Sequence, residues 1–261
     1  MFKSHSRDFF FSNHTGPRMK TDWTIIIPVF NEAGSLERLL NRIYELPLAS
    51  RSEVIVADGG STDHTRDVFL ECSRVHPRLY FLEAPRGKGL AIRLAIARAK
   101  GRFIAYMDGD LQYLPEDLPK LTSAVEHGAD LAVSRRRLVW ADDSARRVFS
   151  KVFSGVVSDR MLHLGVSDPQ SGMKAFRASL LPHLHLTEKH WGLDVQLIKQ
   201  AQAARARIKE VDIRFLPRDS GSTKTGFVST SFDLLKTAFR ASGQKTAKSR
   251  AFSSSRVRRR V

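Results

Sequence analysis

Two aspartates and a glutamine follow a short apolar run near the middle of the chain. Residues 102–107 (RFIAYM) are typical of a strand, and Asp108, Asp110 and Gln112 come directly after it. If the chain stays extended there, alternate side chains point to the same side, so these three could converge on one point. Their oxygen atoms suit Mg²⁺ or Mn²⁺ bound together with substrate phosphates. D-x-D is a short pattern that also occurs in ordinary polar turns. A metal site can therefore be inferred only if other features of the sequence also indicate one.

Polar residues also follow three earlier apolar runs, at 23–29, 53–57 and 78–83. These runs alternate with helical spacing, which predicts an α/β fold with a parallel sheet. In such sheets ligands bind at the carboxyl ends of the strands. The sequence therefore predicts one site at this edge, formed by four clusters: Asn31 with Glu32, Asp58, residues 86–89, and residues 108–112. We also expect Ser61 or Thr62 to cap the helix that follows Asp58.

A predicted helix at 115–127 and a strand at 129–134 complete the first half of the chain. The second half is less regular and predicts strands at 173–177 and 207–215 and helices at 144–164, 192–205 and 227–239. We expect residues 1–21 to be a flexible leader, residues 22–241 to form a single domain, and residues 242–261 to be a basic, disordered tail.

The composition excludes several classes of protein. No apolar run reaches the about 18 residues of a membrane span or the length of a signal peptide, and a single cysteine excludes an internal disulfide framework. The net charge of +16 is concentrated at the end, where residues 234–261 carry nine basic residues and no acidic one. Such a tail suits an anionic membrane surface. Nucleic-acid binding would need aromatic residues among the cations, and only Phe239 and Phe252 are present, so we expect no nucleic-acid partner.

Metal-binding carboxylates beside basic loops indicate chemistry on phosphates. A nucleoside diphosphate that leaves a substrate carries negative charge, which a divalent cation and basic side chains neutralise. Four basic residues in or beside predicted loops could supply that charge: Arg135, Lys151, Arg218 and Lys224. Residues 86–89 (RGKG) match neither the P-loop nor the dinucleotide-binding pattern, so ATPase and dehydrogenase functions are not supported.

Eight segments, in order, resemble a known family. IIIPVFNE (25–32), ADGGSTDHT (57–65), RGKGLAIR (86–93) and MDGDLQYLPE (107–116) resemble the inverting, GT-A-fold glycosyltransferases of family two. DPQSGMKAFR (168–177), WGLDVQL (191–197), EVDIRF (210–215) and RDSGSTK (218–224) resemble its polyprenyl-phosphate branch, which includes dolichyl-phosphate mannose synthases and dolichyl-phosphate glucosyltransferases. The resemblance covers about residues 23–240.

The resemblance implies a Rossmann-like, mostly parallel sheet flanked by helices, with amphipathic helices at the C-terminus. It implies single-displacement transfer of a hexose from GDP-mannose or UDP-glucose to a polyprenyl or dolichyl phosphate, with Mg²⁺ or Mn²⁺ as cofactor. The residues it assigns to the nucleotide-sugar are Pro28, Asn31, Glu32, Asp58, Lys88 and Asp108. Asp108, Asp110 and Gln112 would bind the metal, with Asp110 catalytic, and Arg135, Lys151, Arg218 and Lys224 match positions that contact donor or acceptor phosphates.

The chain departs from many relatives at two positions. Asp58 is followed by Gly59 where relatives have a second aspartate, which leaves the contacts to base and ribose open. Tyr113 and Leu114 follow the D-x-D motif where soluble mannose synthases have a basic or histidine-containing turn. Residues 191–197 are closer to the glucosyltransferase-like relatives, and the choice between GDP-mannose and UDP-glucose stays open.

The acceptor decides whether the reaction needs a general base. A lipid phosphate is already ionised at neutral pH, whereas a sugar hydroxyl needs a positioned carboxylate. Asp194 is the candidate for that base, and a transferase that acts on a sugar hydroxyl is the alternative function. Asp194 is equally typical of an acidic residue at a helix N-terminus, and we expect it to orient the acceptor or a phosphate-binding loop.

A lipid acceptor requires contact with a membrane. We expect peripheral binding at the cytoplasmic face, through the predicted helix 227–239 and the basic tail or through a partner protein anchored in the membrane.

Overall fold

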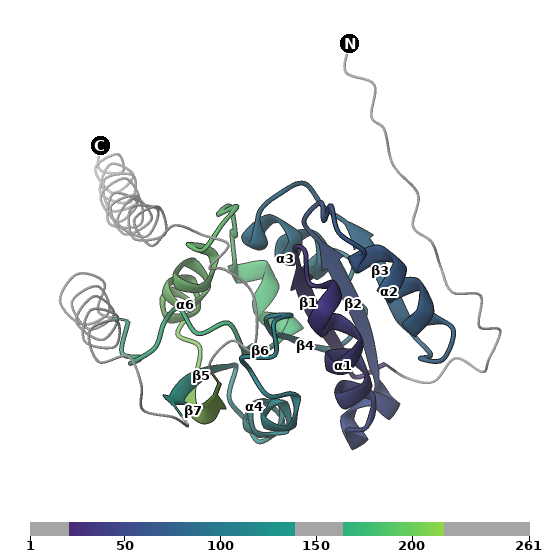
Figure 1. Ribbon diagram of the computed structural model, residues 1–261. Coiled ribbons are helices and arrows are strands. Elements are labelled where there is room, and N and C mark those ends of the chain that lie inside the picture. Colours follow the sequence, from purple (N-terminus) through teal and green to yellow (C-terminus); the bar gives the residue numbers. More distant parts are fainter. Residues whose placement is uncertain (1–20, 139–163, 217–261) are drawn as a thin grey trace, which may run out of the picture.

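The computed structural model describes residues 21–138 and 164–216, which include a seven-stranded mixed sheet in the order β3-β2-β1-β4-β6-β5-β7 (Figure 1). Four strands from the first half pair in parallel: β1 (Trp23–Val29), β2 (Ser52–Asp58), β3 (Leu79–Glu83) and β4 (Phe103–Tyr106). The short strand β6 (Lys174–Arg177) runs antiparallel to both β4 and β5 (Leu131–Leu138), and β7 (Ile208–Phe215) pairs in parallel with β5. Strand β6 therefore joins the parallel half of the sheet to β5 and β7.

Helices cover both faces of the sheet, and the sheet separates two apolar cores. One core contains residues of α1 (Ala33–Tyr44), α2 (Thr65–Ser73) and α4 (Leu118–Glu126). The other contains residues of α3 (Lys88–Ile96) and α6 (Leu193–Ala203). Three 3₁₀-helices complete the described segments: η1 (Pro47–Arg51), η2 (Pro115–Asp117) and η4 (Ala178–His183).

The sequence pattern explains these elements. Strand β1 (WTIIIPV) is an apolar run that is buried along its whole length, as a strand between two parallel neighbours requires. In α1, the buried residues recur at helical spacing, so one face packs on the sheet: Leu36, Leu39, Leu40 and Ile43. The predicted α/β fold with its mostly parallel sheet is confirmed.

One local prediction is wrong, and another differs only in its first turn. Neither Ser61 nor Thr62 caps the following helix, which begins only at Thr65 and has no side-chain cap. The Ser61 hydroxyl instead donates to Asp58, because an aspartate at the start of a turn competes for nearby donors. The predicted helix 115–127 begins as the 3₁₀-helix η2 before it becomes α4. The predicted helices 144–164 and 227–239 lie outside the described residues, and the domain boundaries stay predictions.

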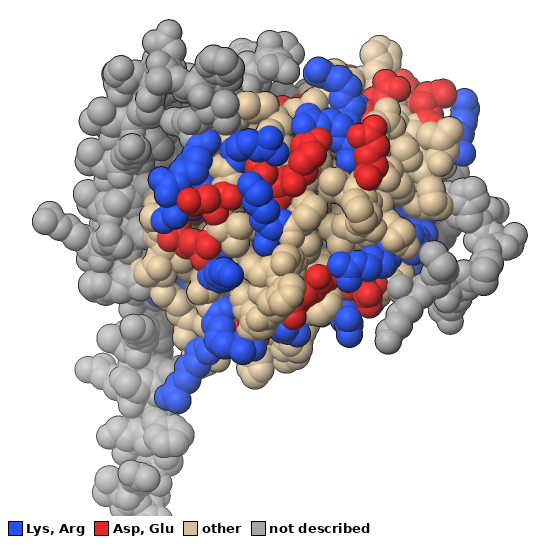
Figure 2. Space-filling model, turned by 90° about the horizontal axis from the view of Figure 1, so that it is seen from below, with Lys and Arg blue, Asp and Glu red and all other residues tan. Residues whose placement is uncertain are grey.

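Basic and acidic side chains are interspersed on the face shown in Figure 2. Several of the described basic residues form ion pairs at the surface, among them Arg42 with Glu116 at 2.6 Å and Arg66 with Glu83 at 2.7 Å. Such pairs neutralise charge locally, so on the face seen in Figure 2 the basic side chains form no large single-sign area.

Candidate functional site

The acidic loop turns away from the strand that precedes it. Strand β4 ends at Tyr106, and Leu111 has a φ of 60°, so residues 108–112 form a turn. The expectation that Asp108, Asp110 and Gln112 lie along an extended chain is therefore wrong. The turn is held by hydrogen bonds from the Gln112 backbone N–H to Asp110 Oδ1 (3.2 Å) and from Gln112 Nε2 to the carbonyl of Leu216 (3.3 Å).

Asp108 lies at the centre of the site. Its Oδ1 is 2.6 Å from Nζ of Lys88, and its Oδ2 faces the backbone of Gly172, where an added Cβ would come within 2.1 Å. Burial raises the pKa of Asp108 to about 6, because the charge of Asp110 adds to the effect of burial while Lys88 only partly opposes it. Any side chain at position 172 would displace the carboxylate from this place.

Lys88 reaches Asp108 because the RGKG segment packs closely against the loop that precedes α6. An added Cβ at Gly89 would lie 2.6 Å from the carbonyl oxygen of His190, and the N–H of Leu90 donates to the carbonyl of Lys189 at 2.9 Å. The glycines therefore permit a close approach of two backbones. Nζ of Lys88 lies 4.7 Å from the centre of the Trp191 ring. Although burial lowers the pKa of Lys88, the charges of Asp108 and Asp194 outweigh it, and the pKa is raised overall.

Asp194 is buried in the first turn of α6, where its Oδ1 accepts hydrogen bonds from the Tyr106 hydroxyl (2.6 Å) and from Nζ of Lys174 (2.7 Å). Tyr106 and Lys174 are direct partners across the antiparallel strands β4 and β6, so their side chains reach Asp194 together. Oδ2 of Asp194 is 3.9 Å from Nζ of Lys88. Burial lowers the pKa of Lys174 despite the opposing charge of Asp194, and burial together with Asp194 raises that of Tyr106.

Four charges of alternating sign thus lie in series through the site, in the order Lys174, Asp194, Lys88 and Asp108. Sequence reasoning missed Lys174 and Tyr106. The available signal was a lysine at the start of one short strand and a tyrosine at the end of an apolar one, where an unpaired buried polar group would be costly.

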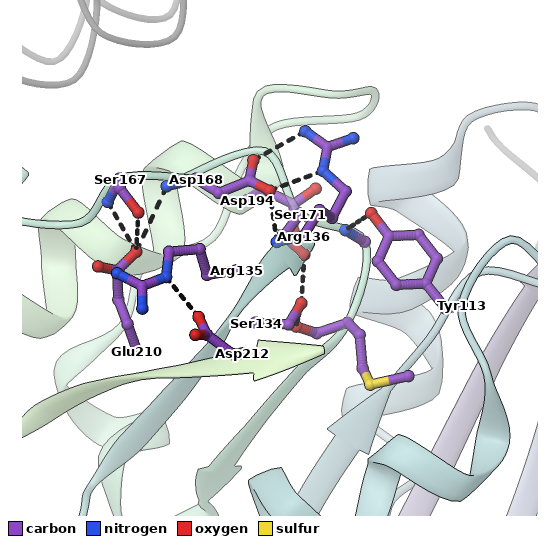
Figure 3. A network of polar contacts seen from close by, with 12 residues as sticks. Tyr113, Ser134, Arg135, Arg136, Ser167, Asp168, Ser171, Asp194, Glu210 and Asp212 are labelled. Atoms are coloured by element: carbon purple, nitrogen blue, oxygen red, sulfur yellow. Dashed lines mark hydrogen bonds and ion pairs between the residues drawn. The ribbon is translucent and has the colours of Figure 1, made fainter. Parts of the chain in front are cut away.

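The ends of β5 and β7 form a second polar network, shown in Figure 3. The guanidinium of Arg136 makes a two-pronged ion pair with Asp168, at 2.6 and 2.7 Å. Arg135 points elsewhere and pairs with Asp212 at 2.5 Å. The hydroxyl of Tyr113 accepts a hydrogen bond from the N–H of Gly172 at 2.6 Å, which ties this network to the loop beside Asp108.

Ser134 and Ser171 also share a hydrogen bond within this network (Figure 3). Arg135 was predicted to contact phosphates, and that role stays a prediction.

The residues predicted to surround the nucleotide lie together at the ends of β1 and β2. Val29 and Asp58 are partners in these two strands. Asn31 has a φ of 56°, and its side chain accepts a hydrogen bond from the N–H of Thr62 at 2.8 Å. Oδ1 of Asp58 accepts from the N–H and hydroxyl of Ser61, at 3.0 and 2.6 Å. Pro28 is buried in β1, and Glu32 follows Asn31 directly, so the structure brings these four predicted residues to one edge of the sheet.

The acidic loop fits a divalent cation. Among the described residues, no three Asp, Glu, His or Cys side chains are grouped closely enough to hold a metal ion. Asp110 is nevertheless close enough to Asp108 for its charge to raise the pKa of Asp108. Two carboxylates and the amide of Gln112 are hard oxygen donors that leave ligand positions for a diphosphate, as Mg²⁺ and Mn²⁺ prefer. Three predicted phosphate ligands lie outside the described residues: Lys151, Arg218 and Lys224.

Comparisons with known proteins identify the family of this chain. The family model described as Glycosyl transferase family 2 matches residues 24–184. An undecaprenyl-phosphate 4-deoxy-4-formamido-L-arabinose transferase of Edwardsiella ictaluri is 28% identical over 78% of this chain and 63% of its own length. A dolichol-phosphate mannosyltransferase of Pyrococcus furiosus is 27% identical over 77% of this chain and 58% of its own length. The chain thus spans about 60% of these relatives.

A shorter relative is covered more fully. An uncharacterised glycosyltransferase of Mycobacterium bovis is 31% identical over 77% of this chain and 88% of its own length. Among solved structures, glucosyl-3-phosphoglycerate synthase from Mycobacterium tuberculosis, in complex with Mn²⁺, UDP and glucosyl-3-phosphoglycerate, has a TM-score of 0.67 and 21% identity. The match covers 85% of this chain and 80% of the synthase chain. At 21% identity it shows that the two share a fold. In the described segments no helix is both long and apolar enough to cross a bilayer.

Proposed function

Because the chain belongs to glycosyl transferase family 2, we propose that it moves a hexose from a nucleotide-sugar to a polyprenyl phosphate. The reaction is a single displacement: the acceptor oxygen attacks the anomeric carbon from the side opposite the departing diphosphate, which inverts the configuration. The names of two relatives, which act on undecaprenyl phosphate and dolichol phosphate, support this acceptor class.

The donor binds at the edge formed by β1, β2 and the acidic loop. Pro28, Asn31, Glu32 and Asp58 surround the nucleotide, and the donor is UDP-glucose or GDP-mannose. A Mg²⁺ or Mn²⁺ ion held by Asp108, Asp110 and Gln112 would neutralise charge on the departing diphosphate. Lys88 adds a positive charge beside that loop, since its Nζ lies 2.6 Å from Asp108.

The contacts of Asp194 support a phosphate, rather than a sugar hydroxyl, as the acceptor. Its Oδ1 already accepts two hydrogen bonds, from Tyr106 and Lys174, and its Oδ2 faces Lys88. A carboxylate with these contacts is poorly placed to take a proton from a substrate, because the contacts would have to break first. An acceptor that is already an anion needs no base, so a phosphate acceptor fits this site better than a sugar hydroxyl. Asp194 then serves to position Lys88.

In this proposal four basic residues contact the acceptor phosphate: Arg135, Lys151, Arg218 and Lys224. Arg135 is 38% exposed in its pair with Asp212, so a phosphate can compete for its guanidinium. The segment 227–239 and the basic tail hold the protein at an anionic membrane surface, alone or with an anchored partner protein.

Nucleotide binding tests this function. Thermal unfolding is measured with GDP-mannose, UDP-glucose, GDP and UDP, each with and without Mn²⁺. A ligand at about a hundred times its Kd stabilises a protein by about 2.7 kcal/mol, which is easily measured. We expect metal-dependent stabilisation by one nucleotide family, lost in Asp110→Ala and kept in Glu37→Ala, which removes an exposed acidic side chain of α1. No response from folded wild-type protein would contradict the proposed function.

A further inference from the structure

The Asp108 carboxylate is confined on two sides. Oδ1 contacts Nζ of Lys88 at 2.6 Å. Oδ2 faces Gly172 so closely that a Cβ there would lie 2.1 Å away. The Gly172 backbone is held in turn by its hydrogen bond to the Tyr113 hydroxyl, so this side cannot open easily. A divalent cation that binds Oδ1 of Asp108 therefore meets the ammonium of Lys88 at the same oxygen.

A second carboxylate lies within reach of the displaced lysine. Oδ2 of Asp194 is 3.9 Å from Nζ of Lys88, and a shift of about 1 Å gives a direct ion pair at the usual length. Asp194 cannot easily move away, because Tyr106 and Lys174 hold its other oxygen. A lysine is suited to such a shift, since its ammonium is a compact charge on a flexible stem.

We propose that Lys88 competes with the divalent cation for Asp108, and that Asp194 receives Lys88 when the cation binds. This inference rests on the proposed function, because the cation site belongs to it. Lys174 and Tyr106 act as positioning residues that keep Asp194 in place. The lysine stays beside the acidic loop after the shift, where its charge remains available to the donor diphosphate.

The alternation of charge explains why the shift is favourable. A cation at Asp108 and Asp110 would repel a lysine left at Asp108, whereas Asp194 still attracts it. Without Lys174, the cationic partner left to the buried Asp194 among the described residues would be Lys88. Asp194 would then hold Lys88 away from Asp108 permanently. The pairing of Lys174 with Asp194 leaves Lys88 shared between two carboxylates.

Metal binding without nucleotide tests this competition. Isothermal titration with Mn²⁺ is carried out on wild type, Lys88→Met and Lys189→Met. Lys189 is an exposed lysine of the loop that packs on the RGKG segment, so its removal controls for the loss of one nearby positive charge. We expect Lys88→Met to bind Mn²⁺ about tenfold more tightly than wild type, and Lys189→Met to bind within about twofold of it.

Two further measurements separate competition from a general effect on the site. With Mn²⁺ present, Lys88→Met should bind UDP about tenfold more weakly, because it lacks the charge that faces the diphosphate. Asp194→Asn should bind Mn²⁺ more weakly than wild type, because the displaced lysine has no carboxylate to receive it. Lys88→Gln replaces Lys88→Met if the latter does not fold.

Equal or weaker Mn²⁺ binding by folded Lys88→Met, or no binding by either protein, would overturn the competition. That result leaves the proposed function standing as long as the wild type still responds to UDP with Mn²⁺. A folded wild type that binds neither Mn²⁺ alone nor UDP with Mn²⁺ would contradict both the competition and the proposed function.

Discussion

Nζ of Lys174 lies 2.7 Å from Oδ1 of Asp194, and both side chains are buried. This ion pair joins the short antiparallel strand β6 to the first turn of α6. The same carboxylate meets Lys88, so the pair connects the interior of the fold to the acidic loop. The stability of the fold and the geometry of the site therefore depend on the same residues.

Removal of Lys174 should destabilise the protein strongly. Lys174→Met leaves Asp194 buried without its closest cation, and breaking a buried ion pair costs about 3–5 kcal/mol in the free energy of unfolding. Urea unfolding measures this cost. The double variant Lys174→Met/Asp194→Asn should recover part of the loss, because no buried charge is left unpaired. Lys209→Met, at an exposed position of β7, serves as control and should change stability by less than about 0.5 kcal/mol. A loss in Lys174→Met no larger than in this control would contradict the role of the pair.

Two glycine substitutions should have opposite effects. Gly172→Ala places a Cβ within 2.1 Å of Asp108 Oδ2, so the carboxylate must move and the Mn²⁺-dependent stabilisation by UDP should be lost. Gly34→Ala meets no atom within 4 Å in the first turn of α1, and should stabilise the protein by up to about 1 kcal/mol. Thermal unfolding with and without Mn²⁺ and UDP measures both effects. An unchanged metal response in folded Gly172→Ala would show that the position of Asp108 does not matter.

The stability contributed by Asp117 should depend on pH. Burial would raise the pKa of Asp117, but hydrogen bonds from Lys120 and Arg214 outweigh it and lower the pKa below its ordinary value. A carboxyl with a depressed pKa in the folded state stabilises the protein above its unfolded pKa of about 3.9, and this contribution is lost as the pH falls through the folded value.

Asp117→Asn should therefore cost about 1–3 kcal/mol at neutral pH, and the difference from wild type should shrink below about pH 4. Urea unfolding of both proteins at neutral pH and below about pH 4 measures this difference in stability. Asp212→Asn, in an exposed pair, is the control and should have little effect at neutral pH. A cost of Asp117→Asn that stays the same at both pH values would argue against a charged Asp117 in the folded protein.

The basic tail should contribute to membrane binding. Flotation with anionic liposomes compares the full chain with a chain that ends at Ala241, which lacks seven of the nine basic residues found in residues 234–261. We expect the full chain to float and the shorter one to bind less, by about 1 kcal/mol for each cation at the surface. Neutral liposomes are the control. Equal recovery of both chains would assign membrane binding to another part of the protein.

The sequence predicted the sheet and the cluster of polar residues at its edge because both follow from local patterns. Asp108, Asp58 and Asn31 each follow an apolar run, and the parallel order of strands brings such ends together. The direction of β6 was not predictable in this way, since a strand of four residues (KAFR) fits either orientation. Tyr106 and Lys174 were missed for a related reason. Their partner Asp194 lies 88 residues from Tyr106 and 20 residues from Lys174 along the chain. Only the register of β4 with β6 brings the three side chains together.

The transfer reaction itself tests the proposed function most directly. Labelled UDP-glucose and GDP-mannose are each incubated with Mn²⁺ and either a polyprenyl phosphate or the polyprenol of the same chain length. We predict that label from one donor reaches the polyprenyl phosphate with inversion at the anomeric carbon, that the polyprenol stays unlabelled, and that chelation of Mn²⁺ stops the reaction. Transfer to the polyprenol, or to neither lipid from folded protein that binds the donor, would contradict the assignment of a phosphate acceptor.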